Sequence, residues 1–187
     1  MNVRLPIFLT TQKLAKRPSI TTIKNKQELL EDLENELLVG LWNALEEDRA
    51  KLQKIEINNS TEKIRTATKL AFNSTLEYCD AYREELVSLL SSNGDISFHN
   101  EIIKLANKEF DLRCPHLFSI NPQTCTVPEL STYAVFKVIY VDAIKNALIL
   151  WLTHYDDMTL TDIKALTALV QTSSPVELMQ ILAQRQN

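Results

Sequence analysis

The sequence predicts an all-α fold: a single-domain helical bundle of about six helices, three long and three short, with an extended basic N-terminal arm. Apolar residues recur every three or four positions over long segments, which is the period of an amphipathic helix. Helix-capping sequences precede several of these segments. The 187 residues include only two glycines, too few for the turns of a hairpin-rich β domain. We assign residues 1–25 to the arm and residues 26–187 to one bundle domain.

The arm is strongly basic. The first 27 residues carry six basic side chains and no acidic one, whereas the rest of the chain is acidic. Pro6 and Pro18 interrupt the segment and favour an extended conformation. Three interpretations stay open: a strap on the acidic first helix, a targeting segment, or a contact to nucleic acid or another anionic surface. The basic residues are Arg4, Lys13, Lys16, Arg17, Lys24 and Lys26.

The first helix is expected to begin at the capping sequence of residues 25–28 and to run for about 30 residues. Gly40 lies inside this pattern. Because glycine disfavours a helix interior, we expect close packing against a neighbouring helix at that position. The buried stripe consists of Leu30, Leu33, Leu37, Leu41, Leu45 and Leu52.

A second capping sequence, residues 59–62, predicts another helix of about 30 residues that ends near Ser91. Ala67, Leu76 and Cys79 fit its buried stripe. Gly94 is suited to the left-handed conformation that often follows a helix.

A shorter helix is predicted over Phe98–Phe110. The next segment, Asp111–Val127, contains Pro115 and Pro122 and shows no helical period. We therefore expect it to be the longest internal loop.

The third long helix is predicted from Pro128 to Leu152. It is apolar nearly all round and too long for a strand, so we expect it to be the central helix of the bundle. Asp142, Lys145 and Asn146 share one narrow polar face. A solvated stripe is the simplest interpretation, and a buried polar network or a ligand-contacting patch is the alternative.

Two short helices close the chain. Thr159 or Thr161 caps a helix that reaches Gln171. Residues 174–177 then combine a capping serine, a first-turn proline and a glutamate, which predicts a last helix.

The two glycines, Gly40 and Gly94, exclude three classes of catalytic motif. A dinucleotide fingerprint, a Walker phosphate loop and a nucleophile elbow each need closely spaced glycines, and these two lie far apart. Glu-x-x-His and His-Glu-x-x-His spacings are also absent. Whether the chain is an enzyme stays open, and these absences favour a non-enzyme.

One group of residues has the chemistry of zinc ligands. Cys114, His116 and Cys125 lie in the predicted loop, with His99 upstream. Their spacing departs from that of structural zinc sites, so the alternative is that the cysteines are small buried hydrophobes. We expect no cofactor, with zinc as the exception to test.

The cysteine count and the hydropathy predict a soluble protein of a reducing compartment. Three cysteines do not form a secreted disulfide framework. The longest apolar run, residues 147–152, is far shorter than a membrane span. We expect a cytoplasmic location, with organelle import as the alternative.

Three functions stay open. The first is a non-enzymatic helical interaction or regulatory module that binds another macromolecule, with a homodimer through a long helix as one form. The second is a small-ligand or metal-dependent helical enzyme with its site inside the bundle. The third is a nucleic-acid-associated regulator that uses the basic arm.

Overall fold

The computed structural model confirms the all-α fold class. The described residues contain helices and connections, and no strand is found among them. Contacts divide the chain into two units, residues 1–33 and 34–187. The first unit contributes only the start of one helix to the described residues, and the other elements belong to the second unit. The described ranges are 26–57, 61–91, 94–120, 122–154 and 157–185.

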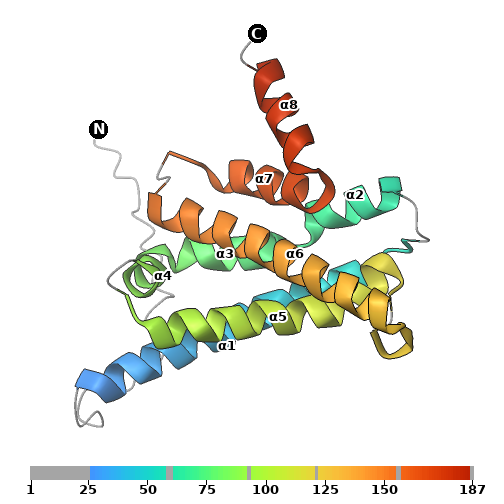
Figure 1. The fold of residues 1–187 in the computed structure, drawn as a ribbon. Helices are drawn as coiled ribbons and strands as arrows, with labels where there is room; N and C mark the ends of the chain where they lie inside the picture. Colours follow the sequence, from blue (N-terminus) through green and yellow to red (C-terminus); the bar gives the residue numbers. More distant parts are fainter. Residues whose placement is uncertain (1–25, 58–60, 92–93, 121, 155–156, 186–187) are drawn as a thin grey trace, which may run out of the picture. The chain divides into compact units, whose positions relative to one another are not determined.

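The helices follow one another with short connections (Figure 1). Helix α7 packs against α2, α3 and α6, while α6 also packs against α4 and α5. The elements are α1 (Lys26–Leu52), α2 (Thr61–Leu70), α3 (Asn73–Ala81), α4 (Arg83–Leu90), α5 (Ile96–Phe118), the 3₁₀ turn η2 (Pro122–Thr124), α6 (Val127–His154), α7 (Leu160–Thr172) and α8 (Pro175–Arg185).

Predicted helix starts in the C-terminal half are confirmed. Thr159, rather than Thr161, caps α7: its side chain accepts from the backbone N–H of Asp162, and Asp162 accepts in return from the backbone N–H of Thr159. Before α8, Ser174 and Glu177 make the same reciprocal pair of hydrogen bonds, at 2.6 and 3.2 Å. These caps satisfy backbone N–H groups that a helix start leaves without partners.

The predicted second long helix is wrong. Residues 61–90 form α2, α3 and α4, interrupted at residues 71–72 and at Tyr82. Phe72 has φ −135° and ψ 23°, and Tyr82 has φ −117° and ψ 30°, so both depart from helical geometry. Neither interruption contains proline or glycine. Side chains of α1 and α5 stabilise the interruption at residues 71–72.

The predicted loop at Asp111–Val127 is wrong in its first half, because α5 continues to Phe118. Pro115 lies in the last turn of α5, where it removes one N–H donor. Its neighbours Cys114 and Leu117 are buried. Burial of these side chains outweighs the hydrogen bond lost at the proline.

Gly94 does not adopt the predicted left-handed conformation. Its role is steric: a Cβ atom there would lie 2.0 Å from the carbonyl oxygen of Leu89. Only glycine allows the chain to pass this close to α4, where the backbone N–H of Asp95 donates to the same carbonyl at 3.1 Å. Asp95 then caps α5 through its side chain.

The predicted long helix α6 forms, but it is not buried on all sides. Val135, Val138 and Ile139 at its middle are 61%, 59% and 62% exposed. The prediction of a central helix is therefore wrong for a single chain. The buried residues of α6 are Val141, Ile144, Trp151 and Leu152.

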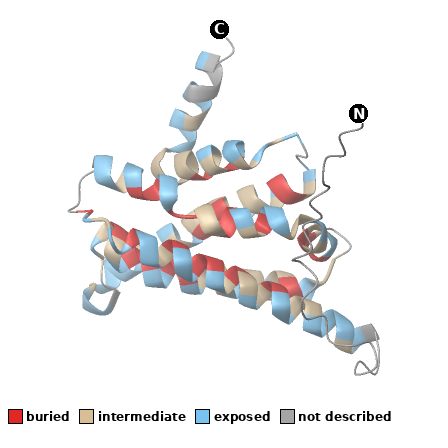
Figure 2. Ribbon diagram, turned by 180° about the vertical axis from the view of Figure 1, so that it is seen from behind, coloured by how far each residue is buried: buried red, intermediate tan, exposed pale blue. Residues whose placement is uncertain are grey.

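The buried leucines of α1 lie in its C-terminal part (Figure 2). The expected close approach at Gly40 is confirmed, since a Cβ atom there would lie 2.2 Å from the hydroxyl oxygen of Tyr78 in α3. That hydroxyl donates to the carbonyl of Leu37 at 3.3 Å. Gly40 thus provides the space that lets the tyrosine ring lie against α1.

We expect Gly40→Ala to lower the free energy of unfolding by about 1–3 kcal/mol, because the added methyl displaces the Tyr78 ring. At an ordinary helix position the same change stabilises by about 1 kcal/mol. Denaturant unfolding measures the difference. In a Tyr78→Leu background the substitution should become neutral or stabilising, and an equal loss in both backgrounds would contradict the assigned role of Tyr78.

Candidate functional site

In the structure, Cys114 and His116 contact different groups of the protein. Because both lie on α5, two residues apart, they point to opposite sides of the helix. Cys114 is buried with Phe110 and Val141. The Nε2 atom of His116 lies 2.9 Å from the carbonyl oxygen of Leu52 in α1.

Of the other two residues of the zinc hypothesis, His99 lies at the start of α5, far from Cys114, whereas Cys125 is near enough to Cys114 to interact with it electrostatically. The Nε2 atom of His99 is 3.1 Å from the carbonyl oxygen of Leu90, and Cys125 is half-buried after η2. Within the described ranges, no group of three or more His, Cys, Asp or Glu side chains is placed to hold a metal ion. The geometry therefore gives the zinc hypothesis no assembled site.

Two of the three polar residues predicted to share a face of α6 lie at its solvent side, and the third is half-buried. Asp142 and Asn146 are exposed. The Nζ atom of Lys145 donates to Asp142 at 2.8 Å, and the lysine side chain is only 16% exposed. For Asp142 and Asn146 this arrangement matches the solvated stripe better than a buried polar network, while Lys145 lines a cavity.

The basic arm falls outside the part of the chain that the structure describes. Arg4, Lys13, Lys16, Arg17 and Lys24 are not described, and Lys26 is described only as the first residue of α1. The three interpretations of the arm therefore stay predictions.

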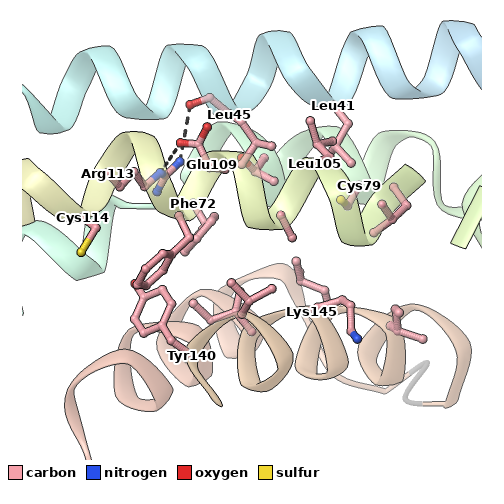
Figure 3. Close-up of a pocket in the computed structure, with 18 of the residues that line it drawn as sticks. Leu41, Leu45, Phe72, Cys79, Leu105, Glu109, Arg113, Cys114, Tyr140 and Lys145 are labelled. Atoms are coloured by element: carbon pink, nitrogen blue, oxygen red, sulfur yellow. Dashed lines mark hydrogen bonds and ion pairs between the residues drawn. The ribbon is translucent and has the colours of Figure 1, made fainter. Parts of the chain in front are cut away.

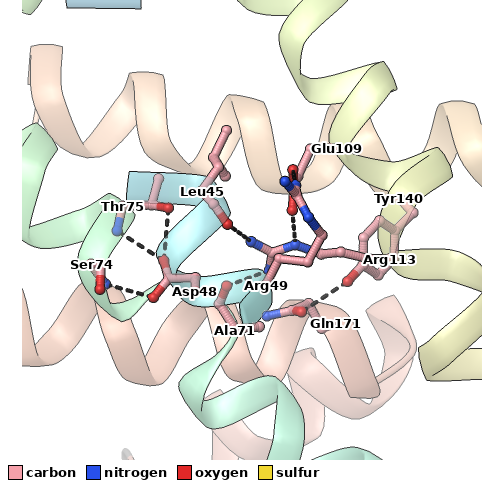
Figure 4. A network of polar contacts seen from close by, with 10 residues as sticks. All are labelled: Leu45, Asp48, Arg49, Ala71, Ser74, Thr75, Glu109, Arg113, Tyr140 and Gln171. Carbon is pink, nitrogen blue, oxygen red and sulfur yellow. Dashed lines mark hydrogen bonds and ion pairs between the residues drawn. The ribbon is translucent and has the colours of Figure 1, made fainter. Parts of the chain in front are cut away.

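A buried carboxylate of α1, which the sequence analysis missed, caps α3 (Figure 4). Asp48 is fully buried. It accepts hydrogen bonds from the backbone N–H groups of Ser74 and Thr75, at 2.8 and 2.9 Å, and from the Thr75 hydroxyl at 2.8 Å. A capping residue normally precedes its own helix. Here the cap for α3 is supplied by another helix.

Arg113 of α5 binds a backbone carbonyl on the other side of the interruption, where α2 ends. The Arg113 guanidinium donates to the carbonyl oxygen of Ala71, at the end of α2, and to that of Leu45 in α1. It also pairs with Glu109, which pairs in turn with Arg49. Two acids, Asp48 and Glu109, thus accompany two arginines, so this polar cluster is close to neutral.

A mostly apolar cavity of about 90 Å³ lies between α1, α3, α5 and α6 (Figure 3). Burial raises the pKa of Tyr140, whose hydroxyl stays protonated and donates to Gln171 at 2.8 Å. Thr75, Glu109, Arg113 and Lys145 also line the cavity, and each of them is bound to another group of the protein. The remaining wall is mostly aliphatic and aromatic, including Leu41, Leu45, Leu105, Phe110, Val141 and Ile144.

A second candidate surface runs along the outer side of α6, and we call it the α6 face. All of its members are exposed, and the apolar ones lie at its centre and at its two ends. It consists of Val127, Ser131, Val135, Val138, Ile139, Asp142, Asn146 and Leu150.

Comparisons with protein-family models, with curated proteins and with solved structures give no match for this chain. Within the described residues, no helix is both long enough and apolar enough to cross a membrane. The function is therefore inferred from the cavity and from the α6 face.

We expect Glu109→Gln to lower the free energy of unfolding by about 3–5 kcal/mol, because it leaves the buried Arg113 and the half-buried Arg49 without their carboxylate. Glu101→Gln is the matched control: it changes the same helix and removes an exposed ion pair with Lys104. That control should cost less than about 1 kcal/mol. Equal losses in denaturant unfolding would contradict a structural role for the buried cluster.

The cysteines should differ in reactivity. Burial raises the pKa of Cys79 to about 12, so only about one molecule in 10⁴ carries its thiolate at pH 8, and the thiolate is the reactive form. Burial also raises the pKa of Cys114. Brief iodoacetamide treatment of the folded protein, followed by mass spectrometry, should modify Cys125 first. Equally fast labelling of Cys79 would show that this region opens readily.

Proposed function

We propose that this chain is a non-enzymatic helical interaction module that associates with a second copy of itself through the α6 face. The observation that carries the proposal is the exposure of Val135, Val138 and Ile139, each close to 60%, at the middle of a long helix. Soluble monomers rarely leave large contiguous apolar patches in water. Burial of these side chains against another chain provides the driving force for association.

The positions of the α6 face favour a second copy as the partner. They are arranged symmetrically about the midpoint between Val138 and Ile139. In an antiparallel pair of α6 helices with a twofold axis through this midpoint, each residue faces its counterpart in the other copy. The facing pairs are Val127 with Leu150, Ser131 with Asn146, Val135 with Asp142, and Val138 with Ile139.

Three of these four facing pairs join residues of similar chemistry. Apolar side chains meet at the centre and at both ends, and the hydroxyl of Ser131 meets the amide of Asn146. In the fourth pair, Asp142 faces the apolar Val135 and keeps its ion pair with Lys145. The contact extends over about 35 Å at 1.5 Å per residue. Dimers with twofold symmetry are also the commonest protein assemblies.

The other two functions receive less support from the described residues. For an enzyme inside the bundle, the charged groups lining the cavity already bind protein partners. For a nucleic-acid regulator, the basic arm lies outside the described ranges. A chain that requires a partner other than a second copy would stay monomeric on its own.

We expect Val138→Glu to abolish self-association, because it places charges at the centre of the interface. Val39→Glu in α1 is the matched control, since Val39 is 60% exposed and Val138 is 59% exposed. Sedimentation velocity over a range of concentrations should show a dimer for the native chain and for Val39→Glu, and a monomer for Val138→Glu. A native chain that stays monomeric at all concentrations would refute the proposal.

The helix direction can be tested by cross-linking in a chain whose Cys125 is replaced by serine. An antiparallel pair brings Ser131→Cys in one copy opposite Asn146→Cys in the other, and places each residue about 22 Å along the axis from its own counterpart. A mixture of the two variants should therefore form a disulfide-linked dimer faster than either variant alone. Preferential linking of Ser131→Cys to itself would instead indicate parallel helices.

A further inference from the structure

We infer that the cavity between α1, α3, α5 and α6 binds the unbranched alkyl chain of a small neutral amphiphile. The polar groups of its wall are committed to the protein. Lys145 binds Asp142, Tyr140 binds Gln171, and Arg113 binds Glu109 and two backbone carbonyls. A ligand inside the cavity therefore meets mainly apolar surface.

The shape of the cavity favours a chain over a ring. The cavity has a volume of about 90 Å³, and an apolar cavity of about 150 Å³ in another protein stays dry and binds benzene. The residues that line it extend from Ile102 to Phe118 on α5, about 24 Å along the helix axis, and from Tyr140 to Ile149 on α6, about 14 Å. A small volume spread over this length suits a narrow, flexible ligand.

The cavity reaches the surface between α5 and α6. Ile102 and Leu105 on α5, and Lys145 and Ile149 on α6, are half-buried lining residues. Phe118 and Tyr140, at the other end, are half-buried lining residues too, so the opening follows the seam between the two helices, and Lys145 is the charged residue among those named. Phe110 holds α5 to α6 through ring contacts with Tyr133, Phe136 and Tyr140 at 5.3–6.0 Å.

The charge at the opening determines the preferred head group. Lys145 already has a carboxylate partner, Asp142, at 2.8 Å. A ligand with its own carboxylate must either displace Asp142 or lose hydration without gaining a cation. Beside Lys145, whose side chain is only 16% exposed, any head group is partly dehydrated. A neutral head group, such as a primary alcohol, loses less free energy in this way than a carboxylate does.

The test uses the full chain and the alcohols 1-butanol, 1-hexanol and 1-octanol in calorimetric titrations, with octanoate as the charged analogue. We expect saturable binding whose affinity rises about fourfold per added methylene, because each one leaves water. Octanoate should bind at least about tenfold more weakly than 1-octanol. Absence of saturable binding, or tighter binding of octanoate, would overturn the inference.

Variants of the wall locate the ligand. Ala106→Phe fills the cavity and should weaken 1-octanol binding by at least about tenfold, whereas Ala50→Phe makes the same change at an exposed position of α1 and should leave it unchanged. Leu105→Trp fills the cavity from its half-buried opening and is the second variant if the first does not fold. Unchanged binding in both cavity variants would overturn the inference.

The monomeric variant Val138→Glu separates this inference from the proposed function. Val138 does not line the cavity, so Val138→Glu should keep its affinity for 1-octanol. Loss of binding in that variant would place the alcohol on the α6 face and overturn the inference. Retained binding in a native chain that does not dimerise would support the cavity while refuting the proposed function.

Discussion

The fold depends on how the protein satisfies the backbone at residues 71–72, where the helical path from α2 to α3 is interrupted. An interruption leaves carbonyl groups without partners on one side and N–H groups on the other. Arg113 donates to the carbonyl of Ala71, and Asp48 accepts from the N–H groups of Ser74 and Thr75. Each charge also has the sign that the adjacent helix end favours. Three segments far apart in the sequence are thereby fixed to one another.

The charges that close this interruption are buried, which requires a balanced cluster. Burial of a lone arginine would cost several kcal/mol. Glu109 compensates Arg113, and Arg49 shares that glutamate. The guanidinium of Arg113 also lies 4.4 Å from the ring centroid of Phe72, so the aromatic residue at the interruption adds a cation–π contact. The cluster is stable only as a set, because removal of one member leaves the others without partners.

Local signals predicted several helix starts, the close approach at Gly40 and most of the α1 stripe, with the exposed Leu30 as an exception. The polar contacts between helices were beyond them. Asp48 stands seven positions after Leu41 and four before Leu52, in phase with the buried leucines. A charge in such a position signals a buried polar contact, but the sequence does not identify its partner. At Pro115 the prediction failed for a different reason. The proline is a strong local signal for a loop, but the burial of Cys114 and Leu117 outweighs it and the helix continues.

The exposure of α6 shows why apolar composition alone does not place a helix in a fold. A helix that is apolar nearly all round needs cover on every side, but the sequence does not say which chain supplies it. In a single chain, α6 buries Val141 and Ile144 and leaves Val138 and Ile139 in water. In the proposed dimer the second copy covers these residues, and α6 becomes central to the assembly. The composition of α6 is then explained by two chains together.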